Sequence, residues 1–111
     1  MRTPPAAADD PVLGRAVERL VAALAPDRIY LFGSRARGDA GPDADYDFMV
    51  VVGESADPAL TRARTGYRAL LGLGIAKDVL VWTREEFDSM LHLKASLPAT
   101  VVREGRLLHG G

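Results

Sequence analysis

Apolar positions recur along the chain at two spacings, one typical of helices and one typical of buried strands. The helical spacing begins after Asp10-Pro11, a capping residue followed by a proline suited to the first helical position. It predicts an amphipathic helix that ends near Pro26. Short apolar runs bounded by Gly, Pro and Asp predict strands instead. The expected strands cover residues 28–32, 46–52 and 76–82, with a short edge strand over 106–109.

A second long helix is predicted between the strands at 46–52 and 76–82. Asp57-Pro58 repeats the capping signal at its head, and the helix reaches about Leu71. Its inner face is expected to consist of Leu60, Ala63, Tyr67, Leu70 and Leu71. We expect Arg62, Arg64 and Arg68 on the solvated side, where Arg64 or Arg68 could contact a partner or phosphates.

Shorter helices are predicted elsewhere in the chain. One follows Gly33-Ser34 and extends to about Arg37. A capping box over residues 83–86 begins another, with Phe87, Met90 and Leu91 facing inward. A last helix covers residues 96 to about 104. Because the strand at 46–52 is apolar on both faces, we expect it at the centre of a small sheet covered by helices, an α/β (α+β) fold.

Length and composition narrow the range of functions. We expect one domain over residues 10–111, preceded by a flexible Pro- and Ala-rich lead-in over residues 1–9. A formal net charge of −1 argues against a general nucleic-acid or membrane binder. The absence of cysteine excludes disulfides and thiolate metal sites and fits a reducing cytoplasm. No apolar run approaches the length of a membrane span, and the excess of arginine over lysine hints at a bacterial, GC-rich source.

Two aspartates stand at the entrance to the central strand. Asp45 and Asp47 are two residues apart, so strand alternation places both carboxylates on one face and Tyr46 on the other. Their Cα atoms would lie roughly 6.6 Å apart, close enough for both carboxylates to bind Mg²⁺. Without a cation the pair is unfavourable, because two like charges disfavour ionisation. The alternative is that both are ordinary polar residues of a strand entrance.

A glycine and a serine follow the first strand. Gly33 allows the backbone to approach a ligand closely, and Ser34 can cap the short helix while its hydroxyl and the neighbouring N–H groups face a phosphate. Arg35 and Arg37 add positive charge beside this turn. The turn and the two aspartates together predict one element for phosphates and one for a metal.

These two motifs, Gly33 to Gly38 and Asp45-Tyr46-Asp47 leading into Val50-Val51-Val52, resemble the signature of the minimal nucleotidyltransferases of the DNA polymerase β-like superfamily. The resemblance implies a polymerase β-like core with a small mixed sheet flanked by helices. It also implies that Gly33, Ser34 and Arg35 bind a nucleoside triphosphate, and that Asp45, Asp47 and Asp78 are catalytic and bind two Mg²⁺ ions. Ala44 and Tyr46 depart from the usual pattern, but neither replaces a ligand.

The resemblance further implies a biological role. Short members of this family are often antitoxins paired with a HEPN-domain toxin, a helical RNase, and they transfer AMP from ATP to a tyrosine of that partner. We expect the catalytic core to use the whole chain, so that another molecule must present the acceptor hydroxyl. Two alternatives stay open: adenylylation of a small molecule such as an antibiotic, and an antitoxin that neutralises its partner by binding alone.

Overall fold

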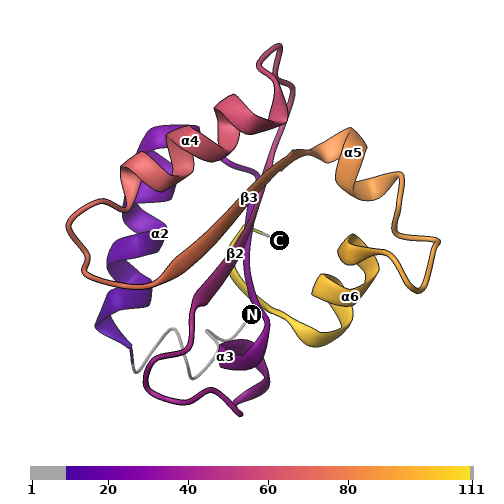
Figure 1. Ribbon diagram of the computed structural model, residues 1–111. Coiled ribbons are helices and arrows are strands. Elements are labelled where there is room, and N and C mark those ends of the chain that lie inside the picture. The colour runs from indigo at the N-terminus through magenta and orange to yellow at the C-terminus, as the bar shows by residue number, and fades with distance from the viewer. Residues whose placement is uncertain (1–9, 111) are drawn as a thin grey trace.

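Four strands form one mixed sheet in the spatial order β3-β2-β1-β4 (Figure 1). β1 (Arg28–Phe32) runs antiparallel to β2 (Tyr46–Val52) and to β4 (Arg106–Gly110), whereas β3 (Lys77–Thr83) runs parallel to β2. The computed structural model describes residues 10–110, so the predicted lead-in over residues 1–9 lies outside the described residues. The predicted mixed α/β fold is confirmed, and each strand begins and ends within one residue of its expected position.

Helices cover both faces of the sheet. Figure 1 shows α2 (Pro11–Leu24) and α4 (Ala59–Ala69) on one side and α5 (Arg84–Asp88) and α6 (Leu97–Glu104) on the other. The short α3 (Ser34–Arg37) follows β1 directly. No helix within residues 10–110 has the length and apolarity needed to cross a membrane.

The sheet separates two apolar cores, and β2 contributes to both because its side chains alternate between the faces. Its residues from Phe48 to Val51 have no measurable exposure, which confirms its predicted central position. The core under α2 and α4 includes Leu13, Leu20, Phe48, Val50, Leu70 and Val79. The core under α5 and α6 includes Tyr30, Met49, Val51, Phe87 and Val101.

Most of the predicted helix signals are confirmed. The Asp10 side chain accepts a hydrogen bond from the backbone N–H of Val12 (2.9 Å) and caps α2. Thr83 and Glu86 form the predicted capping box of α5. The Ser96 side chain caps α6. Each of these caps satisfies backbone donors that the first turn of a helix leaves free.

The predicted orientation of α4 is correct for Leu70, which is buried, and for Arg64 and Arg68, which are exposed, but wrong for three other residues. Arg62 is only 6% exposed, whereas Leu60 and Leu71 lie on the surface. The reason is Gly66: a Cβ atom there would lie 2.7 Å from Cγ1 of Val79, so α4 approaches β3 closely along this face. The face that carries Arg62 and Gly66 therefore turns toward the sheet.

Buried Arg62 has a hydrogen-bond partner for each of its guanidinium nitrogens. Nε donates to the carbonyl of Val81 (3.2 Å), Nη1 to the carbonyl of Asp57 (2.8 Å), and Nη2 to the Glu86 carboxylate (2.8 Å). A buried charge requires such partners. Arg62 thereby ties the start of α4 to the end of β3 and to α5.

Two local predictions also need correction. Asp57 does not cap α4, because Pro58 occupies the N-cap position and no side chain caps this helix. Leu91 does not face inward from a helix, because α5 ends at Asp88 and Leu91 is exposed in the following turns.

Candidate active site

The strand register brings three segments together at one end of the sheet. Phe32, the last residue of β1, pairs with Asp47 near the start of β2. Asp47 in turn pairs with Asp78 near the start of β3. Gly33 follows Phe32, so the glycine turn and the two paired aspartates meet at the same end. β3 therefore lies beside β2, and Asp78 is the neighbour of Asp47 at this end of the sheet.

Gly33 lies directly against Asp47. Its φ of 73° and ψ of −159° belong to a backbone region that side chains strongly disfavour. A Cβ atom at this position would overlap Oδ2 of Asp47 and lie 3.1 Å from Cγ. Glycine is therefore required here for two independent reasons, the backbone conformation and the closeness of the carboxylate.

The helix that follows this turn begins differently from our expectation. Gly33, not Ser34, is the N-cap of α3, and Ser34 is the first helical residue. The backbone N–H groups of Ala36 and Arg37 donate to the carbonyl of Gly33 (3.1 and 3.2 Å). Within the described residues, the N–H groups of Ser34 and Arg35 and the Ser34 hydroxyl have no hydrogen-bond partner. These donors lie at the helix end that favours anions.

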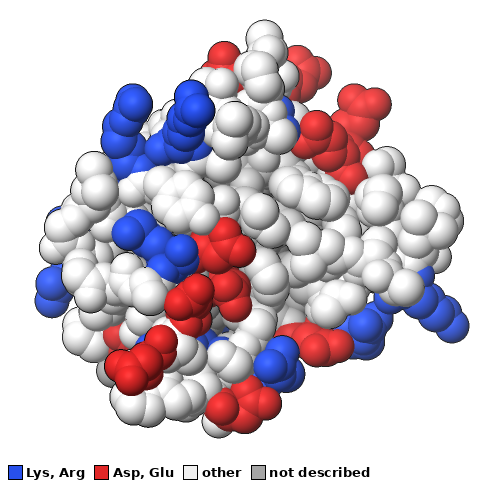
Figure 2. Space-filling model, viewed as in Figure 1, with Lys and Arg blue, Asp and Glu red and all other residues white. Residues whose placement is uncertain are grey.

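The carboxylates at this end of the sheet influence one another. Burial raises the pKa of Asp47 above its usual range, and repulsion from Asp78 and Asp45 raises this pKa further. The charge of Arg37 opposes the increase. Figure 2 shows acidic side chains gathered over the beginning of β2 and β3, with basic side chains directly beside them. The site thus concentrates negative charge that a cation would stabilise.

Tyr67 of α4 holds the third carboxylate. Its hydroxyl donates to Oδ1 of Asp78 (2.7 Å) and accepts a hydrogen bond from the backbone N–H of Val79 (3.1 Å). The bond to Asp78 is the main reason why the pKa of Tyr67 is raised. Sequence reasoning missed this contact, because Tyr67 has no motif around it and reaches Asp78 only through the packing of α4 on β3.

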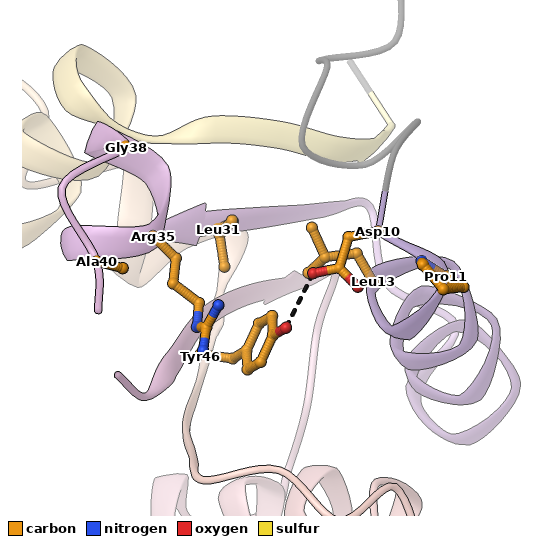
Figure 3. Close-up of a pocket in the computed structure, with 8 residues that line it drawn as sticks. All are labelled: Asp10, Pro11, Leu13, Leu31, Arg35, Gly38, Ala40 and Tyr46. Carbon is orange, nitrogen blue, oxygen red and sulfur yellow. Dashed lines mark hydrogen bonds between the residues drawn. The ribbon is translucent and has the colours of Figure 1, made fainter. Parts of the chain in front are cut away.

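Arg35 is not placed beside the carboxylates. Its Nε donates to the carbonyl of Ala44 (2.9 Å) and its Nη2 to that of Pro42 (3.2 Å). The guanidinium carbon lies 3.9 Å from the centre of the Tyr46 ring, and the Tyr46 hydroxyl donates to Asp10 (Figure 3). Arg35 therefore fixes the loop that leads into β2.

Arg35 and Tyr46 also line a pocket of about 390 Å³ beside the start of α2 (Figure 3). The pocket opens on the face of β2 opposite to Asp47, because Tyr46 and Asp47 are neighbours in a strand. It therefore lies at the same end of the sheet as Gly33 and Asp47, but on the opposite face.

Comparison with known proteins identifies the family. A family model for the nucleotidyltransferase domain matches residues 13–108. The chain belongs to this family. No curated protein matches the chain.

Two solved structures share the fold of this nucleotidyltransferase domain. One comes from a crystal structure of a toxin–antitoxin with AMP-PNP; it is 23% identical, with a TM-score of 0.60, over 88% of this chain and 73% of the other. The second is a candidate nucleotidyltransferase of Sulfolobus solfataricus, 24% identical with a TM-score of 0.59, over 80% of this chain and 84% of the other. At these identities the likeness extends to the fold alone.

The donor set of this nucleotidyltransferase domain suits a hard divalent cation, because it consists of carboxylate oxygens whose charges repel one another. Within residues 10–110, however, no group of three His, Cys, Asp or Glu side chains is arranged closely enough to hold a metal ion. Metal binding would therefore require the carboxylates to turn toward a common point. The family generally uses ATP and a divalent metal, and the donor chemistry found here agrees with that use.

Proposed function

We propose that this protein is an adenylyltransferase of the bacterial cytoplasm that transfers AMP from ATP to a tyrosine hydroxyl of a partner protein, a HEPN-domain toxin. The observation that carries the proposal is the meeting of Gly33, Asp47 and Asp78 at one end of the sheet in a chain of the nucleotidyltransferase domain family. The partner is proposed from the resemblance of the motifs to minimal nucleotidyltransferases. The similarity to a chain of a toxin–antitoxin solved with AMP-PNP supports it.

Each residue of the site has a proposed role. Gly33 and Ser34 hold the β and γ phosphates, for which the N–H groups at the start of α3, unpaired among residues 10–110, are suited. Asp45, Asp47 and Asp78 hold two Mg²⁺ ions. Arg35, which binds the loop before β2, contributes by keeping that loop and Asp45 in place.

The reaction forms a bond between the acceptor oxygen and the α-phosphorus, and it breaks the bond between that phosphorus and the oxygen that leaves with pyrophosphate. Asp78 receives the proton of the acceptor hydroxyl. Bound Mg²⁺ would neutralise the charge on the phosphates and lower the pKa of the acceptor hydroxyl. Tyr67 keeps Asp78 oriented through its 2.7 Å hydrogen bond.

The test is to co-express the chain with the product of its neighbouring gene, add ATP and Mg²⁺, and record the intact masses of both proteins. We expect a gain of one or more AMP units on the partner, on tyrosine. The gain should disappear in an Asp45→Asn, Asp47→Asn variant that still folds.

Other outcomes would favour the alternatives. A tight complex without any change of mass in either preparation would mean that the protein neutralises its partner by binding alone. No change in the partner, together with AMP transfer to a hydroxylated small molecule such as an aminoglycoside, would mean a small-molecule adenylyltransferase.

A further inference from the structure

The outer face of α4 carries apolar residues that the core does not use. Leu60 and Leu71 are each 64% exposed and Tyr67 is 36% exposed, while Arg62 is buried on the opposite face. A helix that covers a sheet normally has the reverse arrangement, with its leucines inside and its arginines in solvent. The outward leucines at the start of α4 and just beyond its end therefore need an explanation other than packing within this chain.

Arginines lie between these apolar residues on the same face. Leu60, Arg64 and Tyr67 recur at intervals of four and three, the spacing of one helix face. Leu71 follows four residues later, in the turn just beyond α4. Arg68 borders them. We call this set, Leu60, Arg64, Tyr67, Arg68 and Leu71, the outer stripe of α4.

The outer stripe borders a groove of about 400 Å³, which Lys77 lines from the start of β3. Among the described residues, Arg64, Arg68 and Lys77 form no ion pair, although five other arginines do. The groove is therefore a concentration of unpaired positive charge on a protein whose net charge is −1. Figure 2 shows basic side chains over α4 and beside the acidic group.

The groove leads to the candidate active site. Tyr67 lines it, and the hydroxyl of the same residue binds Asp78. A molecule seated on the outer stripe would therefore lie next to the third carboxylate, Asp78.

We propose that the outer stripe of α4 is the docking surface for a protein acceptor with an acidic, partly apolar face, which it positions with its hydroxyl at Asp78. This inference rests on the proposed function, because it assumes that Asp78 faces the acceptor. Charge complementarity supplies the acidic character of the partner. The two exposed leucines favour a protein over a nucleic acid, because phosphate contacts have no use for aliphatic side chains.

The experiment compares three variants in complex with the product of the neighbouring gene. The test variant is Arg64→Glu, Arg68→Glu. The charge-matched control is Arg15→Glu, Lys94→Glu, which reverses two exposed cations elsewhere on the surface. The third variant, Leu93→Glu, probes the other exposed apolar region, between α5 and α6. Partner affinity, the salt dependence of this affinity, and AMP transfer are measured for each, together with binding of ATP.

We expect the test variant to bind the partner at least about tenfold more weakly, since reversed rim charges repel an acidic face. AMP transfer to the partner should fall in parallel, while ATP binding is unchanged. The control and Leu93→Glu should behave as wild type. Wild-type affinity should also decrease as salt is added, because the pair is attracted by exposed charges.

Several results would overturn the proposal. The first is that the wild-type chain forms no complex with this partner. The second is that the test variant binds the partner as tightly as wild type, and the third is that only Leu93→Glu loses the partner. The fourth is that nucleic acid, and not a protein, co-purifies with the wild-type chain and is lost from the test variant. The first result would also overturn the proposed partner, whereas the second and third leave the proposed function intact. A failure of the proposed function alone would look different. In that case the wild-type complex would form and depend on the outer stripe, but no AMP would be transferred.

Discussion

At the scale of single residues, Gly33 is the position where the site tolerates least change. We predict that Gly33→Ala abolishes nucleotidyl transfer, because the new Cβ would displace the Asp47 carboxylate. Gly38→Ala is the matched control: Gly38 also has a positive φ, of 84°, but nothing lies within 4 Å of a Cβ placed there.

Gly38→Ala should lose about 1–2 kcal/mol of stability, the cost of a left-handed helical residue. Gly33→Ala should lose about 1–3 kcal/mol from its less favourable backbone region, and only this variant should lose activity per folded molecule. Urea denaturation and transfer assays on the two proteins would check this. Equal loss of activity in both variants would show that strain alone, and not contact with Asp47, explains the requirement for glycine.

The raised pKa of Asp47 predicts a pH dependence of stability. Because the folded state binds the proton of this carboxyl more tightly than the unfolded state, it loses stability as the pH rises from the usual pKa through the raised one. Without metal, Asp47→Asn should therefore be more stable than wild type at neutral pH, by about 1 kcal/mol or less for a partly exposed group.

This difference should vanish near about pH 3, where an ordinary aspartate is mostly protonated. Urea denaturation in EDTA across this range measures it, with Asp43→Asn, an exposed loop carboxylate, as control. A gain that persists unchanged at low pH would mean that charge repulsion at Asp47 is not its cause.

The part of the candidate site that belongs to short sequence motifs could be predicted from the sequence. Gly33, Asp45 and Asp47 lie within one short stretch, in motifs that can be recognised before the fold is known. The contacts of Tyr67 and Arg35 could not be derived in this way. Both depend on which way a long side chain turns after distant elements have packed, which neither spacing nor residue type determines.

At the scale of elements, α4 shows why a helix can be predicted correctly while part of its buried face is assigned wrongly. Its sequence carries apolar residues on two faces, so the 3.6-residue spacing fits either orientation. Gly66 decides between them by allowing close contact with Val79, and Arg62 is then buried with a hydrogen-bond partner at each guanidinium nitrogen. A glycine that selects the packed face has no signature in the sequence itself.

The position of α4 also predicts a role for Tyr67. In Tyr67→Phe the ring stays in place but Asp78 loses its hydrogen-bond donor and Val79 loses an acceptor. We expect kcat for AMP transfer to fall about tenfold, the equivalent of about 1.4 kcal/mol for one lost hydrogen bond. KM for ATP and affinity for the partner should be unchanged.

Steady-state kinetics on purified variants would measure these quantities. Tyr46→Phe is the control, because it removes a hydroxyl that binds Asp10 on the opposite face of β2. If both variants lose kcat equally, the effect comes from loss of stability and not from the orientation of Asp78.

At the scale of the whole molecule, the mixed sheet is what assembles the site. β1 pairs antiparallel with β2, and β2 pairs parallel with β3. The end of β1 and the starts of β2 and β3 therefore lie at the same end of the sheet. The sequence predicted the strands, but their order and direction follow from long-range pairing. The parallel pair depends on α4 as the crossover between β2 and β3.

This arrangement predicts that ligand binding stabilises the entire fold. Mg²⁺ with ATP would bridge the turn after β1 and the starts of β2 and β3, segments that come together only in the folded chain. At a concentration 100 times the dissociation constant, binding adds about 2.7 kcal/mol. For a domain of this size that corresponds to a rise of about 10 °C in the unfolding midpoint.

Thermal unfolding with Mg²⁺ alone, ATP alone and both together measures this coupling. The largest shift should require both, since the carboxylates repel the triphosphate unless a cation lies between them. The Asp45→Asn, Asp47→Asn variant should lose the additional shift that Mg²⁺ confers, whatever its own midpoint. An equal shift in this variant, or the full shift with ATP alone, would mean that the nucleotide binds without the carboxylates and that they do not hold its metal.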